Sequence, residues 1–191
     1  MNLTVAVPNK VFKFIKMDSS NANIDLRDIK ADELDVNSTN ARINVENVET
    51  KSADISSTNA KISIDGISGE ELKVNTTNGK IEVISVDSQE VDLNTTNGTL
   101  FIRDIKEKVK EINASTNNGN IAIFLKDVYK PVKAKVKNHF KDMDTSNFSD
   151  SLFTNFVTED GAMIAYTDGF DEGKDSLEIT ASTYNGTINI Q

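Results

Sequence analysis

The sequence predicts an all-β protein that folds as a single-stranded parallel β-solenoid. This β-helix has about eight coils of ~19 residues, is right-handed, and carries an irregular cap near its C-terminus. Three observations predict this fold. An asparagine recurs every 19 residues, apolar side chains occupy the same five positions of each repeat, and a short polar motif separates two alternating apolar segments.

The repeat is visible in the segments SSNANIDL, STNARINV, STNAKISI, TTNGKIEV and TTNGTLFI, which begin at residues 19, 38, 57, 76 and 95. A sixth copy, TNNGNIAI, follows a two-residue insertion, and a last copy, TYNGTINI, lies near the C-terminus. We expect their asparagines to form a ladder at one corner, with amides hydrogen-bonded along the stack. These asparagines are Asn21, Asn40, Asn59, Asn78, Asn97, Asn118 and Asn185.

The apolar positions predict two short strands in each repeat. When a unit is numbered from 1 to 19 with its asparagine at position 8, positions 2, 4, 11, 13 and 16 are apolar in each of the first five units. In the second unit they are Leu34, Val36, Ile43, Val45 and Val48. Alternation at 2 and 4, and again at 11 and 13, is typical of β-strands with one buried face. Position 6 is always serine or threonine, and we expect it to face inward at the corner.

Two architectures fit these strands and corners. Asn-Gly is the usual hairpin turn, so an antiparallel meander is one alternative. A solenoid is favoured because each residue stacks on its counterpart one coil below, at ~4.8 Å, and this stacking requires a constant period. Three units carry alanine after the asparagine, which also weakens the hairpin interpretation.

We expect one domain over residues 1–191, with regular repeats over 1–125, a degenerate coil over 126–140, an irregular cap or insert over 141–177 and a final coil over 178–191. A cap is expected because an open solenoid end exposes unpaired backbone and core. Three strands are predicted individually. They are Leu3–Val7, a strand that starts at Val11, and Ala162–Thr167 within the cap.

Composition removes several classes of function. The 191 residues include no cysteine and one histidine, His139, so thiolate and multi-histidine metal sites are excluded and no metal or cofactor is expected. A formal charge of −9 argues against nucleic acid as a partner. No apolar stretch approaches the ~20 residues that span a bilayer, so no transmembrane segment is expected.

The Ser/Thr-Thr-Asn-Gly-x-Ile-x-Val signature resembles that of a bacterial adhesin-like domain family. The resemblance covers essentially the whole chain, is strongest over Phe14–Ile123 and returns over Leu177–Ile190. It implies a β-helical domain of uncharacterised function on or near the cell envelope. The family motif brings no catalytic residue with it.

Outward positions beside the asparagine corner form a second array. Position 7 holds Thr39, Thr58, Thr77 and Thr96, and position 5 holds Asn37, Ser56, Asn75 and Asn94. A regular array of hydroxyls and amides is suited to binding a glycan, or even ice, through matched hydrogen bonds. The alternative is that these side chains satisfy the turn backbone and stack on one another.

Two charged segments are also candidates. Lys133, Lys135 and Lys137 lie on one face of a predicted strand, where an anionic cell-wall polymer would dock, or where lysines discourage edge-to-edge aggregation. Carboxylates over residues 159–175 are of the type that binds calcium. Their spacing matches neither the EF-hand nor the nonapeptide calcium repeat, which favours a solvated acidic turn.

These features predict a non-enzymatic bacterial domain, an adhesin or binding scaffold that lies outside the cytoplasm, at the cell surface or secreted. Its expected partner is a glycan, a cell-wall polymer or a surface protein. A self-assembling structural or envelope-stress-sensing module is the first alternative, and a polysaccharide-active enzyme is the second. Catalysis is disfavoured because the outward Asp, Glu and Lys residues are scattered without an acid–base constellation.

Overall fold

A computed structural model describes residues 10–140, 144–149, 151–171 and 174–191. Its strands are β1 (Val11–Ser19), β2 (Ile24–Ser38), β3 (Ile43–Ser57), β4 (Ile62–Thr76), β5 (Ile81–Thr95), β6 (Leu100–Ile105), β7 (Glu111–Asn118), β8 (Ile121–Ile123), β9 (Val132–Asn138), β10 (Phe153–Glu159), β11 (Ala162–Thr167), β12 (Leu177–Asn185) and β13 (Ile188–Ile190). A 3-10 helix, η1, spans Thr145–Asn147. The strands predicted from Val11 and over Ala162–Thr167 are confirmed, and Leu3–Val7 lies outside the described residues.

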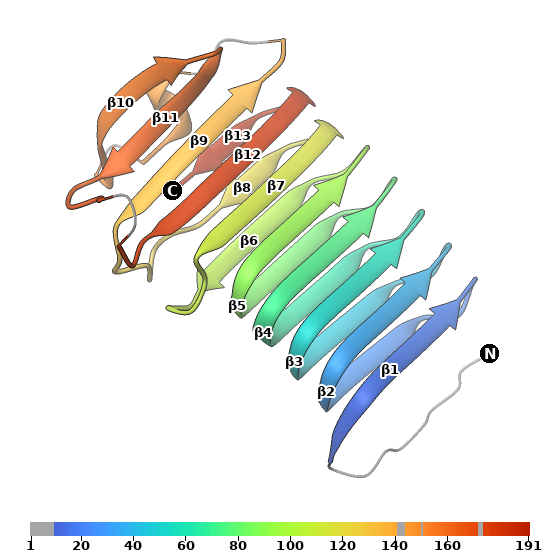
Figure 1. The fold of residues 1–191 in the computed structure, drawn as a ribbon. Helices are drawn as coiled ribbons and strands as arrows, with labels where there is room; N and C mark the ends of the chain where they lie inside the picture. The colour runs from blue at the N-terminus through green and yellow to red at the C-terminus, as the bar shows by residue number, and fades with distance from the viewer. Residues whose placement is uncertain (1–9, 141–143, 150, 172–173) are drawn as a thin grey trace.

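The strands stack as a parallel solenoid, as the sequence predicts (Figure 1). Each of the long strands β2–β5 contributes to both faces of the solenoid. One face consists of β1, the second halves of β2–β5, and then β7, β12 and β9. The other face consists of the first halves of β2–β5, and then β6, β8 and β13. The register is that of the repeat, because Ile24 pairs with Ile43 and Ile43 with Ile62. Parallel pairing rules out the meander. The stack has about six turns, slightly fewer than the expected eight, and the degenerate segment contributes only the strand β9 to it.

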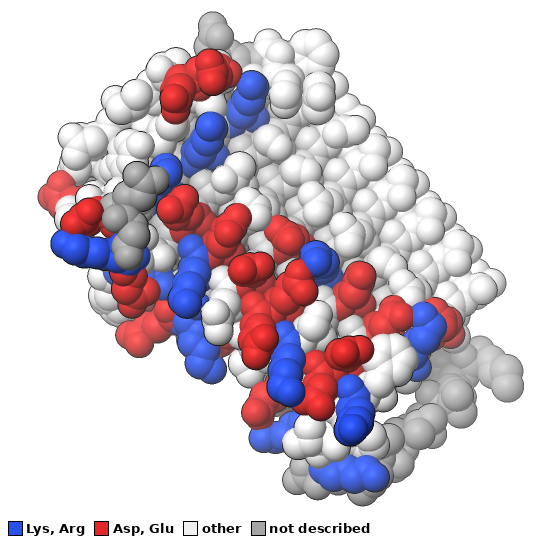
Figure 2. Space-filling model, in the orientation of Figure 1, with Lys and Arg blue, Asp and Glu red and all other residues white. Residues whose placement is uncertain are grey.

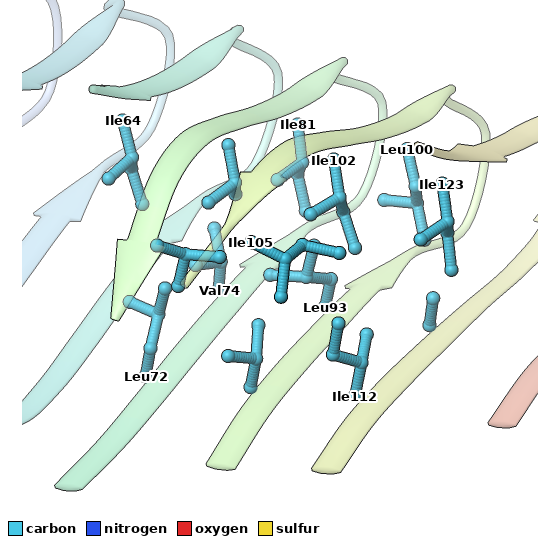
Figure 3. Packing of buried hydrophobic residues seen from close by; sticks show 14 of the residues in the cluster. Ile64, Leu72, Val74, Ile81, Leu93, Leu100, Ile102, Ile105, Ile112 and Ile123 are labelled. Carbon is cyan, nitrogen blue, oxygen red and sulfur yellow. The ribbon is translucent and has the colours of Figure 1, made fainter. Parts of the chain in front are cut away.

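The apolar positions of the repeat fill the space between the two faces. Figure 3 shows Ile81 and Ile102 of one face pointing toward Leu93 and Ile112 of the other. All predicted core positions from Ile24 to Ile105 are buried. Burying one such side chain contributes about 1.5–3 kcal/mol, so the repeated core is the main source of stability.

The asparagine corner exists in two forms that the sequence distinguishes. Where serine faces inward, alanine follows the asparagine, and the Oγ of Ser57 accepts the N–H of Ala60 at 3.1 Å. Where threonine faces inward, glycine follows, and the Oγ1 of Thr95 donates to the carbonyl oxygen of Gly79 at 3.3 Å. A Cβ on Gly98 would lie 1.9 Å from the Gly79 oxygen, so this second form requires glycine. The same pairing of types holds in Ser38 with Ala41, Thr76 with Gly79, Thr116 with Gly119 and Thr183 with Gly186.

The order of coils in the stack departs from their order in the chain. Strand β12 pairs in parallel with both β7 and β9, so the last coil lies between the sixth repeat and the degenerate segment. The repeat motif explains this placement. The Nδ2 of Asn185 donates to Asn118 at 2.9 Å, and the N–H of Thr187 donates to the Oδ1 of Asn120 at 2.9 Å. β9 lacks this motif, because Asn138 pairs with Thr183 and Phe140 therefore stands at the place of the corner asparagine.

The cap contains an antiparallel hairpin in addition to irregular segments. β11 pairs antiparallel with β9, and β10 with β11, so the parallel stack ends in two antiparallel strands. The hairpin turn is Asp160-Gly161, whose φ angles of 50° and 72° are those that a tight two-residue turn requires.

The segment around η1 covers the last strand of the second face. The side chain of Asn147 donates to the carbonyl oxygen of Ile188 at 2.8 Å, and the N–H of Ser149 donates to that of Ile190 at 2.9 Å. Phe148 is buried and lies 5.1 Å from the ring of Phe153, which begins β10. The described residues 144–149 and the hairpin β10–β11 therefore lie over the end of the core.

Replacing Gly98 with alanine is expected to lower the free energy of unfolding by about 1–3 kcal/mol, the usual effect of overpacking. The reason is the 1.9 Å approach of the new Cβ to the Gly79 oxygen. The urea midpoint measures this change. The double variant Thr95→Ser, Gly98→Ala recreates the Ser57–Ala60 type of corner and should recover part of the loss. A single variant as stable as the wild type would contradict this explanation of the corner.

Candidate functional site

The asparagine corner carries the first candidate surface, which we call the polar strip. It consists of Asn21, Asn40, Asn59, Asn78, Asn97, Asn118 and Asn185 together with Thr39, Thr58, Thr77 and Thr96. Each asparagine Nδ2 donates to the Oδ1 of the asparagine one coil before it, at 2.8–3.1 Å. The ladder is therefore continuous, including the step from Asn118 to Asn185 where the chain order is broken.

Positions 5 and 7 behave differently on this surface. Position 5 is self-linked, since Ser56 donates to Asn37, Asn94 to Asn75 at 3.4 Å, and Ser115 to Asn94 at 2.9 Å. The threonines of position 7 are exposed, Thr96 only partly. In the described part of the chain, their hydroxyls make no hydrogen bond to protein. The stacking interpretation thus fits position 5, whereas position 7 presents a row of hydroxyls to solvent.

Charge is segregated from the polar strip. Figure 2 shows an uncharged surface over the carboxyl ends of β1–β5 and mixed charge toward the opposite corner of the coils. Many of those charges are paired between neighbouring coils, as in Lys16–Asp35 at 2.6 Å and Lys51–Asp32 at 2.8 Å. Exposed pairs of this kind add little stability, usually below about 1 kcal/mol. The residues of the strip are uncharged, and beside it Lys61 and Lys80 are paired with Glu82 at 2.5 and 3.5 Å.

The corner opposite the strip forms a second candidate surface, a groove of about 1040 Å³. It follows a column of residues at position 15 with positive φ, between 53° and 80°, which bends each long strand. The column consists of Asp28, Asn47, Gly66, Ser85 and Asp104. The signal was present in the sequence, because four of the five are Asp, Asn or Gly, which tolerate left-handed backbone, and the five recur every 19 residues.

Of the nine charged residues that line the groove, six form ion pairs with one another in the described part of the chain. Lys30 lies 2.6 Å from Glu49, and Lys108 lies 3.2 Å from Asp87. Asp104 accepts hydrogen bonds from Lys106 at 2.6 Å and from Ser85 at 2.5 Å. The hydrogen bond from Lys106, and next that from Ser85, hold the pKa of Asp104 below its ordinary value. The pairs Lys30–Glu49 and Lys108–Asp87 join neighbouring coils.

The three predicted lysines lie on the outward face of β9, and each is only partly exposed. Lys133 lies 3.5 Å from Glu178 and 5.9 Å from the centre of the Phe170 ring. The Nζ of Lys137 donates to the carbonyl oxygen of Asp160 at 3.1 Å. Two of the three cations are therefore engaged with the protein itself, which weakens the case for an anionic polymer here.

The acidic segment over 159–175 disperses its carboxylates among different partners. Asp168 accepts from Thr154 at 2.7 Å, and Asp171 lies 2.5 Å from Lys174. Across the described ranges, no group of three or more His, Cys, Asp or Glu side chains is placed to hold a metal ion. Within the same ranges, no helix is long and apolar enough to cross a membrane.

The aromatic side chains at the end of the strip were not predicted from the sequence as part of a site. The rings of His139 and Tyr184 are stacked, with centroids 4.0 Å apart and planes inclined by 10°. Phe140 lies beside them, 6.2 Å from Tyr184. The sequence does contain one sign of this cluster, because tyrosine replaces threonine at position 7 of the last repeat, TYNGTINI. Its partner ring, His139, follows β9, and it lies beside Tyr184 only because β12 pairs with β9.

Comparison with known families gives one match. The family described as Toastrack DUF4097 matches residues 1–191. No curated protein and no solved structure matches the chain.

The hydrogen bonds of Asp104 predict a pH dependence of stability. Because its folded-state pKa is lowered, the ionised carboxylate stabilises the protein above the unfolded value of about 3.9. This contribution is lost as the pH falls through the folded-state value. Asp104→Asn tolerates the left-handed backbone and should make the acid limb of the stability curve shallower. An NMR titration that places the Asp104 carboxyl at or above its ordinary pKa would contradict the prediction.

Proposed function

The chain belongs to the Toastrack DUF4097 family, a β-solenoid family of uncharacterised function, and on that basis we propose that it is a non-enzymatic binding scaffold that recognises a neutral glycan chain along the polar strip. The proposal places the domain outside the cytoplasm, at a bacterial cell surface, following the adhesin-like resemblance of its repeat. It serves as a rigid rod on which a polymer lies across successive coils.

The single observation that carries the proposal is the row of unpaired threonine hydroxyls on an uncharged band. Hydroxyls at one coil spacing, ~4.8 Å, offer a donor and an acceptor at every step. The strip itself contains only asparagine and threonine although the chain carries a net −9, and the nearest cations, Arg42, Lys61 and Lys80, follow its asparagines by two residues. A neutral polymer of hydroxylated units matches both features, whereas a polyanion or a polycation matches neither.

A direct test measures binding of neutral linear hexasaccharides by isothermal titration calorimetry, with cellohexaose and chitohexaose as probes. The double variant Thr58→Val, Thr77→Val removes two hydroxyls without changing side-chain shape, and we expect at least a tenfold loss of affinity, since hydrogen bonds contribute about 0.5–1.5 kcal/mol each. Thr180→Val, an exposed threonine of β12 outside the strip, is the matched control and should bind as the wild type does.

Other outcomes distinguish the alternatives. A variant with Lys133, Lys135 and Lys137 changed to Glu should bind the hexasaccharides normally, and loss of binding in it would favour an anionic ligand at β9. Release of reducing sugar would indicate a polysaccharide-active enzyme. Filaments that form with rising protein concentration, without ligand, would indicate a self-assembling module.

A further inference from the structure

The position-7 column of the polar strip ends in aromatic rings. Thr95 pairs with Thr116, Thr116 with Thr183, and Thr183 with Asn138, so the residues that follow them occupy successive coils of one column. Beyond the threonines that column contains Asn117, then Tyr184, then His139. From Thr39 to His139 it covers six coil steps, or about 29 Å at ~4.8 Å each.

The rings at this end are exposed yet held in place. Tyr184 is 45% exposed and Phe140 is 72% exposed. The N–H of His139 donates to the carbonyl oxygen of Thr183 at 3.0 Å, and that of Phe140 donates to the Oδ1 of Asn138 at 2.9 Å. With the backbone tied to the last coil and two rings stacked, the aromatic surface is organised before any ligand arrives. Binding to such a surface loses less conformational entropy than binding to mobile side chains.

We propose that Tyr184, His139 and Phe140 form an aromatic subsite that anchors one sugar ring of a neutral glycan lying along the polar strip. This inference rests on the proposed function and assigns the end of the site. A sugar ring has an apolar face of C–H groups that packs on an aromatic ring and a rim of hydroxyls that bond to polar neighbours. The column supplies both chemistries in line, with the rings at one end and the free threonine hydroxyls along the rest.

A glycan fits this surface better than a protein does. A protein interface needs a central apolar patch surrounded by a polar rim. Here the apolar groups gather at one end of a long, narrow polar row. On the neighbouring strand β9, the Nζ of Lys137 is held by the carbonyl oxygen of Asp160 at 3.1 Å.

The test compares chitohexaose and cellohexaose binding to the full chain carrying Tyr184→Ala or Phe140→Ser. Each variant is expected to bind at least tenfold more weakly than the wild type, which corresponds to about 1.4 kcal/mol. The matched control is Tyr129→Ala, because Tyr129 is 85% exposed but lies at the groove on the opposite corner. Saturation-transfer NMR on the wild type should show one sugar ring of the hexasaccharide more strongly saturated than the others.

The outcomes separate the subsite from the function on which it rests. Normal affinity in both aromatic variants, with weakened binding in the Thr58→Val, Thr77→Val protein, would overturn the subsite and leave the strip as the glycan site. Weakened binding in the aromatic variants alone would support the subsite and contradict the role of the threonines. A wild-type protein that binds neither hexasaccharide would overturn both. Phe140→Ser tests the subsite even if Tyr184→Ala lowers the melting temperature, since Phe140 is largely exposed.

Discussion

The constraint on which this molecule depends is the register of parallel stacking. Strands ~4.8 Å apart bring each residue against its counterpart in the next coil, so a position that suits one coil must suit its neighbours. Aliphatic residues therefore recur inside the coil, and the corner asparagines recur where their amides bond to one another. The two corner types follow from the same constraint, because in the threonine type a Cβ at the glycine would meet the carbonyl oxygen of the coil below, at 1.9 Å for Gly98.

The same constraint organises the outer surface into columns with different roles. Position 5 is saturated by its own side chains, position 15 bends the strand, and position 7 remains open to solvent. Charges gather at the corner opposite the strip, where pairs such as Lys30–Glu49 join neighbouring coils. Most columns of outward-facing residues are therefore used by the fold itself. The threonine column and its aromatic end are where the surface offers groups that the fold does not use.

The sequence is sufficient to predict the solenoid, the buried positions and the strand Ala162–Thr167, since each depends on local alternation or on a constant period. It is not sufficient to place the last coil, because either β12 or β9 could pair with the free edge of β7, and the two strands differ mainly in their corner motifs. The aromatic end of the strip follows from that placement. Tyr184 and His139 are far apart in the chain and meet only when β12 lies beside β9.

Disulfide trapping of the last coil tests most directly whether register match decides the stack. The chain contains no cysteine, and Ser115 pairs with Ser182 across β7 and β12. At a strand spacing of ~4.8 Å, two cysteines at these positions lie within the usual range for a disulfide. Oxidation of the Ser115→Cys, Ser182→Cys monomer should form an intramolecular disulfide. If the Ser115→Cys, Lys137→Cys protein formed one instead, β9 would follow β7 directly, and the insertion of the last coil would be wrong.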